Sequence, residues 1–437
     1  MSVPSDAHDT VVALARNLIR IPSLTPITSD CRPAAARSLQ LLKDFCEAAG
    51  AHCEWLTFTG GHPRWDYPVD NLYIEWGDPS EPGGLCFLGH TDVVPPGDLA
   101  AWARDPYSGA VEGGFLHGRG ATDMKGAVAA FTVAAAKFAR KSAQVGKRAG
   151  VSLVITTDEE WAAVNGTRRV LEWMGASGRR PAGFVVGEPS SEEHLGEAIK
   201  VGRRGSLCGL LHAGGVQGHA AYPGLFQNSN RALGLAIAIL HAYRWDDGEE
   251  GMPATNFETI AIESGDFDAS AIVPGGARAL WNIRFTHHET PLTLTRKLLD
   301  QFNNPPQWAQ HHPDAQMLLN LRLTANSDTA AMSYYSPPGA LSALASQVVL
   351  RHTGHAPALD CKGGTTDGRF IHGVFPHAEI IELGLPECGG LRRAADPETF
   401  GKAGGMHQVD ECCSIADLDT LTRCYHDLLA GHAEATQ

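Results

Sequence analysis

The chain alternates short, continuous apolar runs with longer segments in which apolar residues recur at helical spacing. Apolar runs bounded by turn or polar residues predict buried strands at Leu85–Leu88, Val151–Ile155 and Gly183–Val186. Apolar residues three and four positions apart predict a helix at Val11–Ile19, and Ala127–Ala139, which is apolar on most sides, predicts a buried one. Strands that alternate with helices in this way favour an α/β domain with a mainly parallel sheet.

The pattern changes near Gly205 and changes back after Pro338. The elements predicted in between are half-buried strands at Gly205–His212 and Ala279–Phe285, helices at Ser229–Tyr243 and Pro291–Phe302, and a polar, proline-rich loop at 303–313. Those predicted beyond it are a helix at Ala340–His352, a strand at Ile380–Leu383 and a helix at Ile415–Leu429. We therefore expect a discontinuous α/β domain, residues 1–205 and 328–437, interrupted by a smaller α+β domain, residues 206–327.

The composition is that of a globular protein with an acidic surface. Of 437 residues, 43% are apolar, 49 are acidic and 35 are basic, which leaves a net charge of −14. Nucleic acids and anionic membranes bind basic surfaces, and no apolar run approaches the length of a membrane span, so neither partner is expected. The N-terminal residues lack the pattern of a signal peptide, and the ten cysteines are scattered without a CxxC pair. We therefore expect reduced thiols and a cytoplasmic protein.

Acidic residues and a histidine follow the predicted strands at their carboxyl ends. His90 and Asp92 follow the first strand, Glu159 and Glu160 the second, and Glu188 the third. Ligands of open α/β sheets bind beyond these ends of the strands. In an extended segment residues i and i+2 share a face, so the Asp92 carboxylate could accept the far ring N–H of His90 and orient the imidazole for a metal.

Two further residues extend this set. Asp123 precedes the buried helix, and His407 lies late in the chain among glycine and polar residues. Each residue alone is more often a helix cap, a turn residue or a solvated side chain. Several carboxylates gathered at one sheet edge would repel one another unless cations lay between them, which favours a metal site. Histidine and carboxylate ligands without cysteine suit zinc, cobalt or manganese.

Competing chemistries lack their motifs. The chain has no GxSxG nucleophile elbow, no Walker A loop and no HExxH pair. Gly118 and Gly120 resemble half of a dinucleotide fingerprint, but Asp123 stands at the third glycine position, where its charge would repel a pyrophosphate.

Seven segments carry a resemblance to a known family. They are GHTDVVPPGD at 89–98, GRGATDMKG at 118–126, TDEE at 157–160, GEPS at 187–190, KVGRRGS at 200–206, GVQGHAAYP at 215–223 and GGTTDGRF at 363–370. In this order they resemble the co-catalytic M20 metallopeptidase family. The segments at 200–206 and 363–370 are most similar to the branch that removes succinate from N-succinyl-LL-2,6-diaminopimelate, an intermediate of lysine biosynthesis.

The resemblance implies two divalent metal ions, zinc first, with cobalt or manganese as alternatives. Asp123 would bridge the two ions, His90 and Glu188 would complete one site, and Glu160 and His407 the other. Glu159 resembles the general base that takes a proton from water, and Asp92 the residue that supports His90. Two metals would lower the pKa of the attacking water and polarise the amide carbonyl.

The resemblance also implies a role for the inserted domain, as a lid and dimer interface. The histidine matching His219 would reach the active site of the partner subunit of a homodimer and stabilise the oxyanion. The residues that would hold the carboxylates and amide of the substrate are Arg203, Tyr222, Arg284, Gly364 and Thr365. Arginine suits this task through bidentate pairing with carboxylates, whereas we expect Arg204 to be a solvated or structural cation.

Three features depart from the family pattern and keep alternatives open. Ala271 stands where an asparagine is usual, Thr366 stands where serine is usual, and residues 386–406, which include Arg392 and Arg393, form an insertion before His407. We expect the insertion to be a surface loop near the active-site mouth. An acetylornithine deacetylase-like enzyme or a dipeptidase is the alternative. A non-catalytic relative is disfavoured, because every ligand position and the base are filled.

Overall fold

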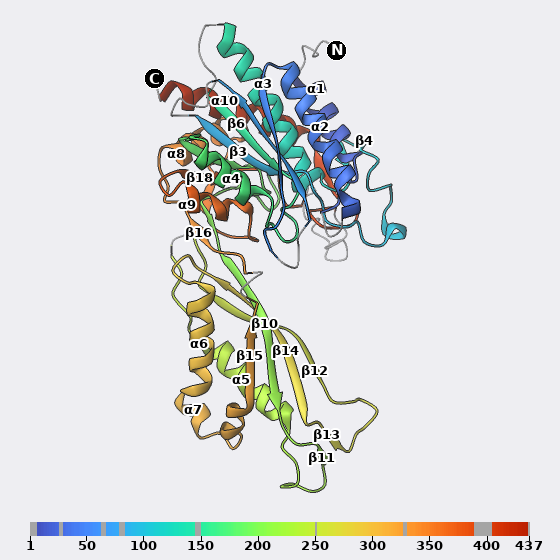
Figure 1. Cartoon of the computed structure of the whole chain (residues 1–437), viewed down its shortest axis with the longest axis vertical. Helices are drawn as coiled ribbons and strands as arrows, with labels where there is room; N and C mark the ends of the chain where they lie inside the picture. The colour runs from blue at the N-terminus through green and yellow to red at the C-terminus, as the bar shows by residue number, and fades with distance from the viewer. Residues whose placement is uncertain are drawn as a thin grey trace. The chain divides into compact units, whose positions relative to one another are not determined.

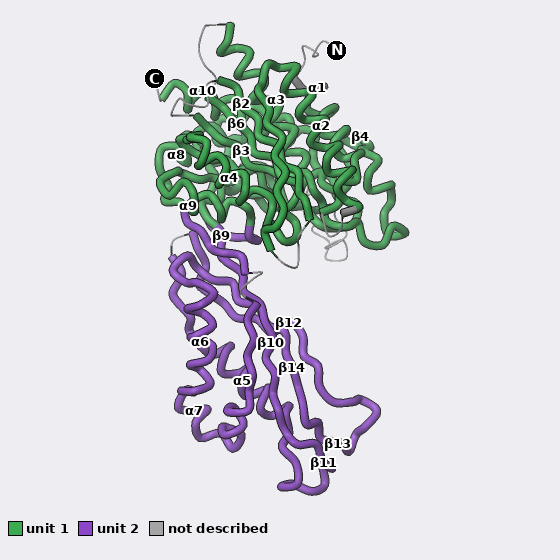
Figure 2. Tube along the Cα trace, viewed as in Figure 1, with its two compact units in different colours: residues 1–202, 336–360, 366–437 green, residues 203–335, 361–365 purple. Residues whose placement is uncertain are grey.

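The structure is a computed structural model that describes residues 7–25, 29–62, 67–77, 84–144, 150–249, 251–326, 330–388 and 404–435. The chain divides into two compact units (Figure 2). The first unit contains residues 1–202, 336–360 and 366–437, and the second contains residues 203–335 and 361–365. The predicted limit between residues 327 and 328 lies outside the described residues, and the domain limits of 206 and 327 stay a prediction.

An eight-stranded mixed sheet forms the centre of the first unit (Figure 1). In spatial order its strands are β1 (His52–Phe58), β2 (Val69–Trp76), β6 (Val151–Thr156), β3 (Leu85–His90), β7 (Gly183–Val186), β18 (Glu379–Glu382), β8 (Ala198–Lys200) and β17 (Ala358–Asp360). β6, β3, β7 and β18 run parallel, and so do β8 and β17. The carboxyl ends of four adjacent strands therefore meet at one edge of the sheet.

Helices cover this sheet, so its central strands are buried along their whole length. The helices are α1 (Ala7–Ile19), α2 (Arg32–Ala48), α3 (Gly126–Gln144), α4 (Thr167–Ala176), α8 (Ala340–Thr353), α9 (Ile371–Val374) and α10 (Ile415–Ala435). α3 contacts α1, α2 and α10, while α4 contacts α9. The small strands β4 (Ala110–Glu112), β5 (Phe115–His117) and β19 (Cys412–Ser414) form a separate sheet.

The second unit has an antiparallel sheet and its own hydrophobic core. The sheet order is β12 (Asn256–Ser264), β14 (Gly276–Phe285), β10 (Gly205–Gly214) and β15 (Leu321–Ala325). The other strands are β11 (Gly218–His219), β13 (Ile272–Val273) and β16 (Tyr334–Tyr335). The helices are α5 (Ser229–Ala242), α6 (Pro291–Asn303), α7 (Gln307–Gln310) and a 3-10 helix at Ala315–Asn320, and β9 (Gly202–Arg203) spans the limit between the units. Alternate residues of β10 are buried beneath α5, as expected of a sheet with one covered face.

The predicted fold class, α/β with a second α+β part, is confirmed, and the predicted strands and helices occur with ends shifted by a few residues. The expectation of a plain loop at 303–313 is wrong, because α7 forms one helical turn there. Its Ala309 is fully buried in the core of the second unit, and this packing stabilises a helical turn that the proline-rich sequence does not predict. No helix in the described ranges is both long and apolar enough to cross a bilayer.

Asp70 of β2 links three elements and provides a test of the packing. Its buried carboxylate accepts hydrogen bonds from Arg32 Nε at 2.8 Å and Nη2 at 2.9 Å, from Thr57 Oγ1 at 2.6 Å and from Trp55 Nε1 at 3.2 Å. Burial opposes ionisation of Asp70, but the hydrogen bonds from Arg32, Thr57 and Trp55 outweigh it and lower the pKa.

Replacing Asp70 by asparagine should lower the free energy of unfolding by about 2 kcal/mol at pH 7, because charged hydrogen bonds are lost. An acid whose pKa is lower in the folded state stabilises the fold above its unfolded pKa, roughly 3.9, and that contribution disappears as pH falls through the folded pKa. Urea unfolding at neutral pH and below pH 4 should therefore show the gap between wild type and variant closing in acid. An unchanged gap would contradict this account.

Candidate metal centre and active site

The chain turns at the carboxyl ends of the parallel strands deliver the predicted ligands to one place in the first unit. His90 is the last residue of β3, Glu160 follows β6 by four residues, and Glu188 follows β7 by two. Asp123 lies in the irregular turn (Ala121–Lys125) that precedes α3, and His407 lies shortly before β19. All five predicted metal ligands therefore converge, although their sequence positions span more than three hundred residues.

Asp123 lies between the two imidazoles. Its Oδ1 is 3.2 Å from His90 Nε2, and its Oδ2 is 3.2 Å from His407 Nε2. His90 Nε2 is also 3.5 Å from Glu188 Oε1, and His407 Nε2 is 3.1 Å from Glu160 Oε1. The result is two histidine–carboxylate clusters that share the Asp123 carboxylate.

The cluster holds more buried negative charge than its own cations balance. Asp123, Glu160 and Glu188 are at most 8% exposed, and among the described residues two imidazoles, those of His90 and His407, contact them. Burial, aided by the charge of Asp123, raises the pKa of Glu160 to about 7 and that of Glu188 well above its ordinary value. Hydrogen bonds to Asp123 and Glu160 raise the pKa of His407 to about 10. To stay ionised, desolvated carboxylates of this kind require cations nearby, and the donor set suits divalent metals with nitrogen and oxygen ligands.

The structure brings the candidate base to the same cluster. Donor atoms of His90, Glu159 and Glu188 lie within 4.8 Å of one another, as do those of His90, Asp123 and Glu160. Burial, with the negative charge of Asp367, raises the pKa of Glu159. Glu159 and Glu160 therefore face the same centre from adjacent positions.

Asp92 positions this segment through the backbone. Its carboxylate accepts the N–H of Glu159 at 3.1 Å and the N–H of Glu160 at 3.1 Å. The ring Nδ1 of His90 lies 2.9 Å from the backbone oxygen of Asp92 and 3.6 Å from the carboxylate Oδ1. The nearer acceptor for the far ring nitrogen is thus the backbone oxygen, while the carboxylate fixes the two glutamates.

Sequence reasoning missed the partners that support the Asp123 turn. Glu411, which is fully buried, accepts the N–H groups of Gly120 and Thr122 at 3.0 Å and that of Asp123 at 3.2 Å. Its other oxygen accepts a hydrogen bond from Arg119 Nη1 at 2.6 Å. The sequence offered one weak signal for Glu411, its position four residues after His407, but no periodic pattern marked it as buried.

A second missed pair lies beside Glu159. Arg369 Nη2 is 3.3 Å from Asp367 Oδ1, and its Nη1 is 4.0 Å from Glu159 Oε1. Thr366, the departure just before them, donates a hydrogen bond to the buried Glu382 of β18, so its hydroxyl anchors this segment to the sheet. Both Asp367 and Arg369 belong to the GGTTDGRF segment. The sequence predicted substrate binding for Gly364 and Thr365 of this segment and no role for Asp367 or Arg369.

His219 and Tyr222 lie on a small hairpin of the second unit. β11, which ends with His219, pairs with β13, and the N–H of Ala220 donates to the Ala271 backbone oxygen at 2.9 Å. His219 Nδ1 accepts the N–H of Ala221 at 3.1 Å. This hydrogen bond leaves Nε2 as the protonated nitrogen of the neutral ring, so the exposed side of His219 is a donor.

Arg203, Arg284, Gly364 and Thr365 also belong to the second unit. Arg203 is buried and donates from Nη1 to the Lys362 backbone oxygen at 2.8 Å. Burial lowers the pKa of Arg284. Arg204 donates to the Asn256 side chain at 2.7 Å, which agrees with a structural rather than substrate-binding cation.

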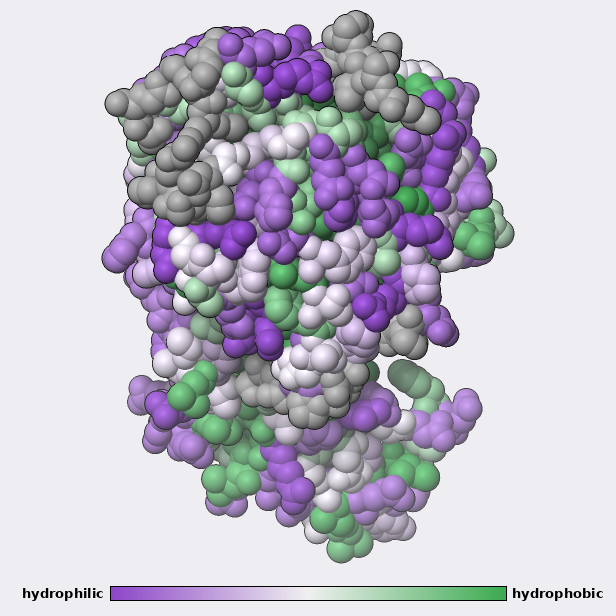
Figure 3. All heavy atoms as spheres, turned by 45° about the horizontal axis from the view of Figure 1, so that its top comes forward, coloured by the Kyte–Doolittle hydropathy of each residue, from purple (hydrophilic) through white to green (hydrophobic). Residues whose placement is uncertain are grey.

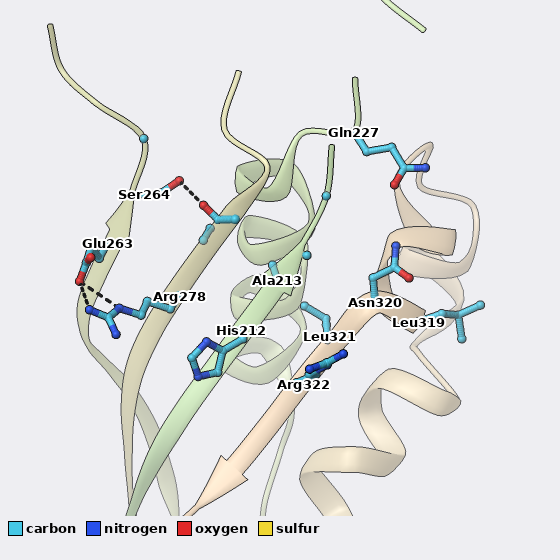
Figure 4. A pocket seen from close by; sticks show the side chains of 15 residues that line it. His212, Ala213, Gln227, Glu263, Ser264, Arg278, Leu319, Asn320, Leu321 and Arg322 are labelled. Atoms are coloured by element: carbon cyan, nitrogen blue, oxygen red, sulfur yellow. Dashed lines mark hydrogen bonds and ion pairs between the residues drawn. The ribbon is translucent and has the colours of Figure 1, made fainter. Parts of the chain in front are cut away.

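A cavity of about 860 Å³ opens on the sheet of the second unit, between β10, β14 and β15 (Figure 4). His212 and Arg322 line it, and Arg278 is held there by an ion pair with Glu263. None of the described residues lining this cavity is a predicted substrate-binding residue. The predicted insertion at 386–406 lies largely outside the described residues, including Arg392 and Arg393. Its described ends meet, because the N–H of Met406 donates to the Glu387 oxygen at 2.9 Å, one residue before His407.

The sequence pattern of peptidase family M20/M25/M40 matches residues 86–431 of the chain. The chain belongs to this family. A succinyl-diaminopimelate desuccinylase of Rhodospirillum centenum is 40% identical over 96% of both chains, and one of Xanthobacter autotrophicus is 37% identical over 96% of this chain and 99% of its own. An M20 family metallo-carboxypeptidase of Sulfolobus solfataricus, 16% identical, shares the fold with a TM-score of 0.71 over 97% of this chain and 99% of its own. The M20 family assignment agrees with the predicted resemblance.

Proposed function

We propose that this M20 protein hydrolyses N-succinyl-LL-2,6-diaminopimelate to succinate and LL-2,6-diaminopimelate. The observation that carries the proposal is the combination of the buried His–Asp–Glu cluster with desuccinylase relatives that are 37–40% identical over almost the full chain. Both observations are needed, because the cluster supports metal-dependent hydrolysis as the type of reaction, whereas the relatives support succinate as the acyl group that is removed.

The first unit would hold two divalent ions, with zinc as the proposed metal. Asp123 would be shared, His90 and Glu188 would hold one ion, and Glu160 and His407 the other, as their 3.1–3.5 Å contacts support. When bound, the ions would supply positive charge that polarises the amide carbonyl and acidifies a water. Asp92 supports the arrangement by holding the backbone of Glu159 and Glu160.

Glu159 is the proposed general base. It would accept a proton from the attacking water and return it to the nitrogen of the leaving amine. Its carboxylate is free for this task because Glu160, not Glu159, makes the hydrogen bond to His407. Arg369 Nη1 lies 4.0 Å from the Glu159 carboxylate, within the range of an ion pair.

The second unit would bind the anionic ends of the substrate. Arg203, Arg284 and Tyr222 would face the carboxylates, and the backbone at Gly364 and Thr365 the amide. His219, with its exposed donor nitrogen, would stabilise the oxyanion across the interface of a homodimer. A cytoplasmic location stays a prediction.

An exposed edge of the second unit supports the proposed homodimer. β12 is an edge strand with exposed Ile260 and Ile262, and Phe267 and Ile272 are exposed nearby in sequence. Figure 3 shows hydrophilic and hydrophobic residues interspersed over this face, with several hydrophobic residues near its lower end. Unpaired edges with apolar side chains are common sites of association between chains. Sedimentation equilibrium that finds only monomers would refute the dimer.

The alternative is a related deacylase, acting on N-acetylornithine, or a dipeptidase. Ala271 favours it, since its methyl group cannot supply the amide that the family pattern places beside the substrate. The backbone of Ala271 still supports the His219 hairpin, so the catalytic part of the proposal is unaffected.

A panel of metal-loaded reactions tests the proposal. We expect hydrolysis of N-succinyl-LL-2,6-diaminopimelate to exceed that of N-acetylornithine and of dipeptides. Removal of metal by a chelator should abolish the activity, and added Zn²⁺ or Co²⁺ should restore it, since the buried carboxylates hold the ions. Full turnover after complete metal removal would contradict the mechanism, and a preference for acetylornithine would contradict the substrate.

A further inference from the structure

A second group of histidine and carboxylate side chains lies in the second unit, on residues that the proposed reaction does not use. Glu249 Oε1 is 3.2 Å from His287 Nδ1 and 2.7 Å from His288 Nε2. All three donor atoms lie within 4.8 Å of one another. We propose that Glu249, His287 and His288 form an additional binding site for a divalent transition-metal ion, with Zn²⁺ as the preferred occupant.

The spacing of the donor atoms leaves room for an ion after a small movement of one ring. Zinc binds imidazole nitrogen and carboxylate oxygen at roughly 2.0–2.2 Å, so two ligands of one tetrahedral ion lie roughly 3.4 Å apart. The 3.2 Å contact between Glu249 and His287 is close to that separation, whereas the 2.7 Å contact with the exposed His288 has the length of a hydrogen bond and would lengthen when an ion binds. Two imidazoles and one carboxylate also form the ligand set of zinc sites that keep an open position for water.

One ring nitrogen of His287 makes no hydrogen bond within the described part of the chain. Its buried Nδ1 has no hydrogen-bond partner among the described residues, although Glu249 Oε1 is only 3.2 Å away. The ring nitrogen is therefore close to the carboxylate without a well-directed N–H between them, which suits an ion shared by both.

The backbone on both sides of the group is held by Asp246. Its carboxylate accepts the N–H of Gly248 at 3.0 Å, close to Glu249, and the hydroxyl of Thr286 at 3.0 Å, next to His287. Thr255, which also bonds to Asp246, accepts the N–H of Thr286 at 3.1 Å. One anchored carboxylate thus sets the distance between the two segments that carry the ligands.

The rings are also oriented and reachable. The His287 ring stacks on Tyr335 with centroids 5.1 Å apart and planes 20° from parallel. His288 is 64% exposed, whereas His287 is 25% exposed, so an ion can enter from solvent on the His288 side. A bound ion would tie the loop at Glu249 to the end of β14 and stabilise the second unit.

Metal content of the full-length protein tests the site. After equilibrium dialysis against Zn²⁺, wild type should hold one more ion per chain than the double variant His287→Gln/His288→Gln. The matched control, His311→Gln/His312→Gln, removes another adjacent histidine pair of the same unit and should hold as many ions as wild type. Because the readout is a difference of one ion, it does not depend on how many ions the first unit binds.

Glu249→Gln provides a second variant that changes charge with little change in shape, and it should weaken zinc binding at this site. Circular dichroism of the metal-free proteins shows whether each variant is folded. Zn²⁺ should raise the Tm of wild type more than that of the folded variants. Three results would overturn the proposal: zinc content of the folded His287/His288 variant equal to that of wild type, zinc affinity of folded Glu249→Gln equal to that of wild type, or an equal loss of zinc in the His311/His312 control.

Discussion

Replacing Glu159 by glutamine is expected to lower kcat for amide hydrolysis by on the order of 10³, within the 10²–10⁴ range that a general base contributes. Glutamine has nearly the same shape but cannot accept the proton of the attacking water. The five proposed ligands are untouched, so metal content should stay that of wild type. Steady-state kinetics with metal analysis of the same samples measures both.

The control for this variant is Glu172→Gln, on the exposed face of α4, which should leave kcat unchanged. Wild-type kcat in Glu159→Gln would remove Glu159 from the mechanism. Loss of metal together with activity would instead make Glu159 a ligand, an outcome that the closeness of its carboxylate to His90 and Glu188 makes worth measuring.

Replacing Glu411 by glutamine is expected to lower the free energy of unfolding by about 3–5 kcal/mol, because it leaves the buried Arg119 guanidinium without its counter-ion. Glu411 and Arg119 are 0% and 2% exposed, so water cannot compensate for the loss. Since Glu411 also holds the N–H of Asp123, affinity for the shared metal position should fall about 10–100-fold. Urea unfolding and zinc competition titrations measure the two effects.

Two companion variants make this prediction specific. Glu112→Gln removes the carboxylate of an exposed ion pair with Arg104 and should change the free energy of unfolding by no more than about 0.5 kcal/mol. Arg119→Met combined with Glu411→Gln removes both buried charges and should recover part of the stability. A loss in Glu411→Gln no larger than that in Glu112→Gln would show that the buried pair contributes little.

The continuous apolar runs located the centre of the fold. The runs at Leu85–Leu88, Val151–Ile155 and Gly183–Val186 correspond to β3, β6 and β7, which are buried along their whole length and therefore have apolar residues at most positions. β1 has no such pattern, because most of its residues are half-buried, and the sequence did not predict it. Local pattern identifies a strand only where burial is uniform or alternates.

Some residues of the candidate site could likewise be predicted from the sequence, and others could not. Five candidate ligands and a candidate base were predicted from the sequence because strand ends are marked by the change from apolar to polar residues, and because the segments around them resemble the M20 family. Glu411, Arg119, Asp367 and Arg369 were missed, since a charged residue that will be buried looks like any surface charge in the sequence. Their contacts span up to 292 positions and exist only after folding.

By itself, the sequence predicted an α/β protein with His90, Glu160 and Glu188 close behind buried strands, because burial and the ends of strands leave a local pattern of apolar and polar residues. The tertiary structure alone decided which of the many carboxylates share one buried space, that Asp123 faces both His90 and His407, and that Glu411 supports it. It also decided that Glu249 meets His287 and His288. The physical reason is that desolvation and charge pairing depend on distances between segments remote in sequence, which no local pattern records.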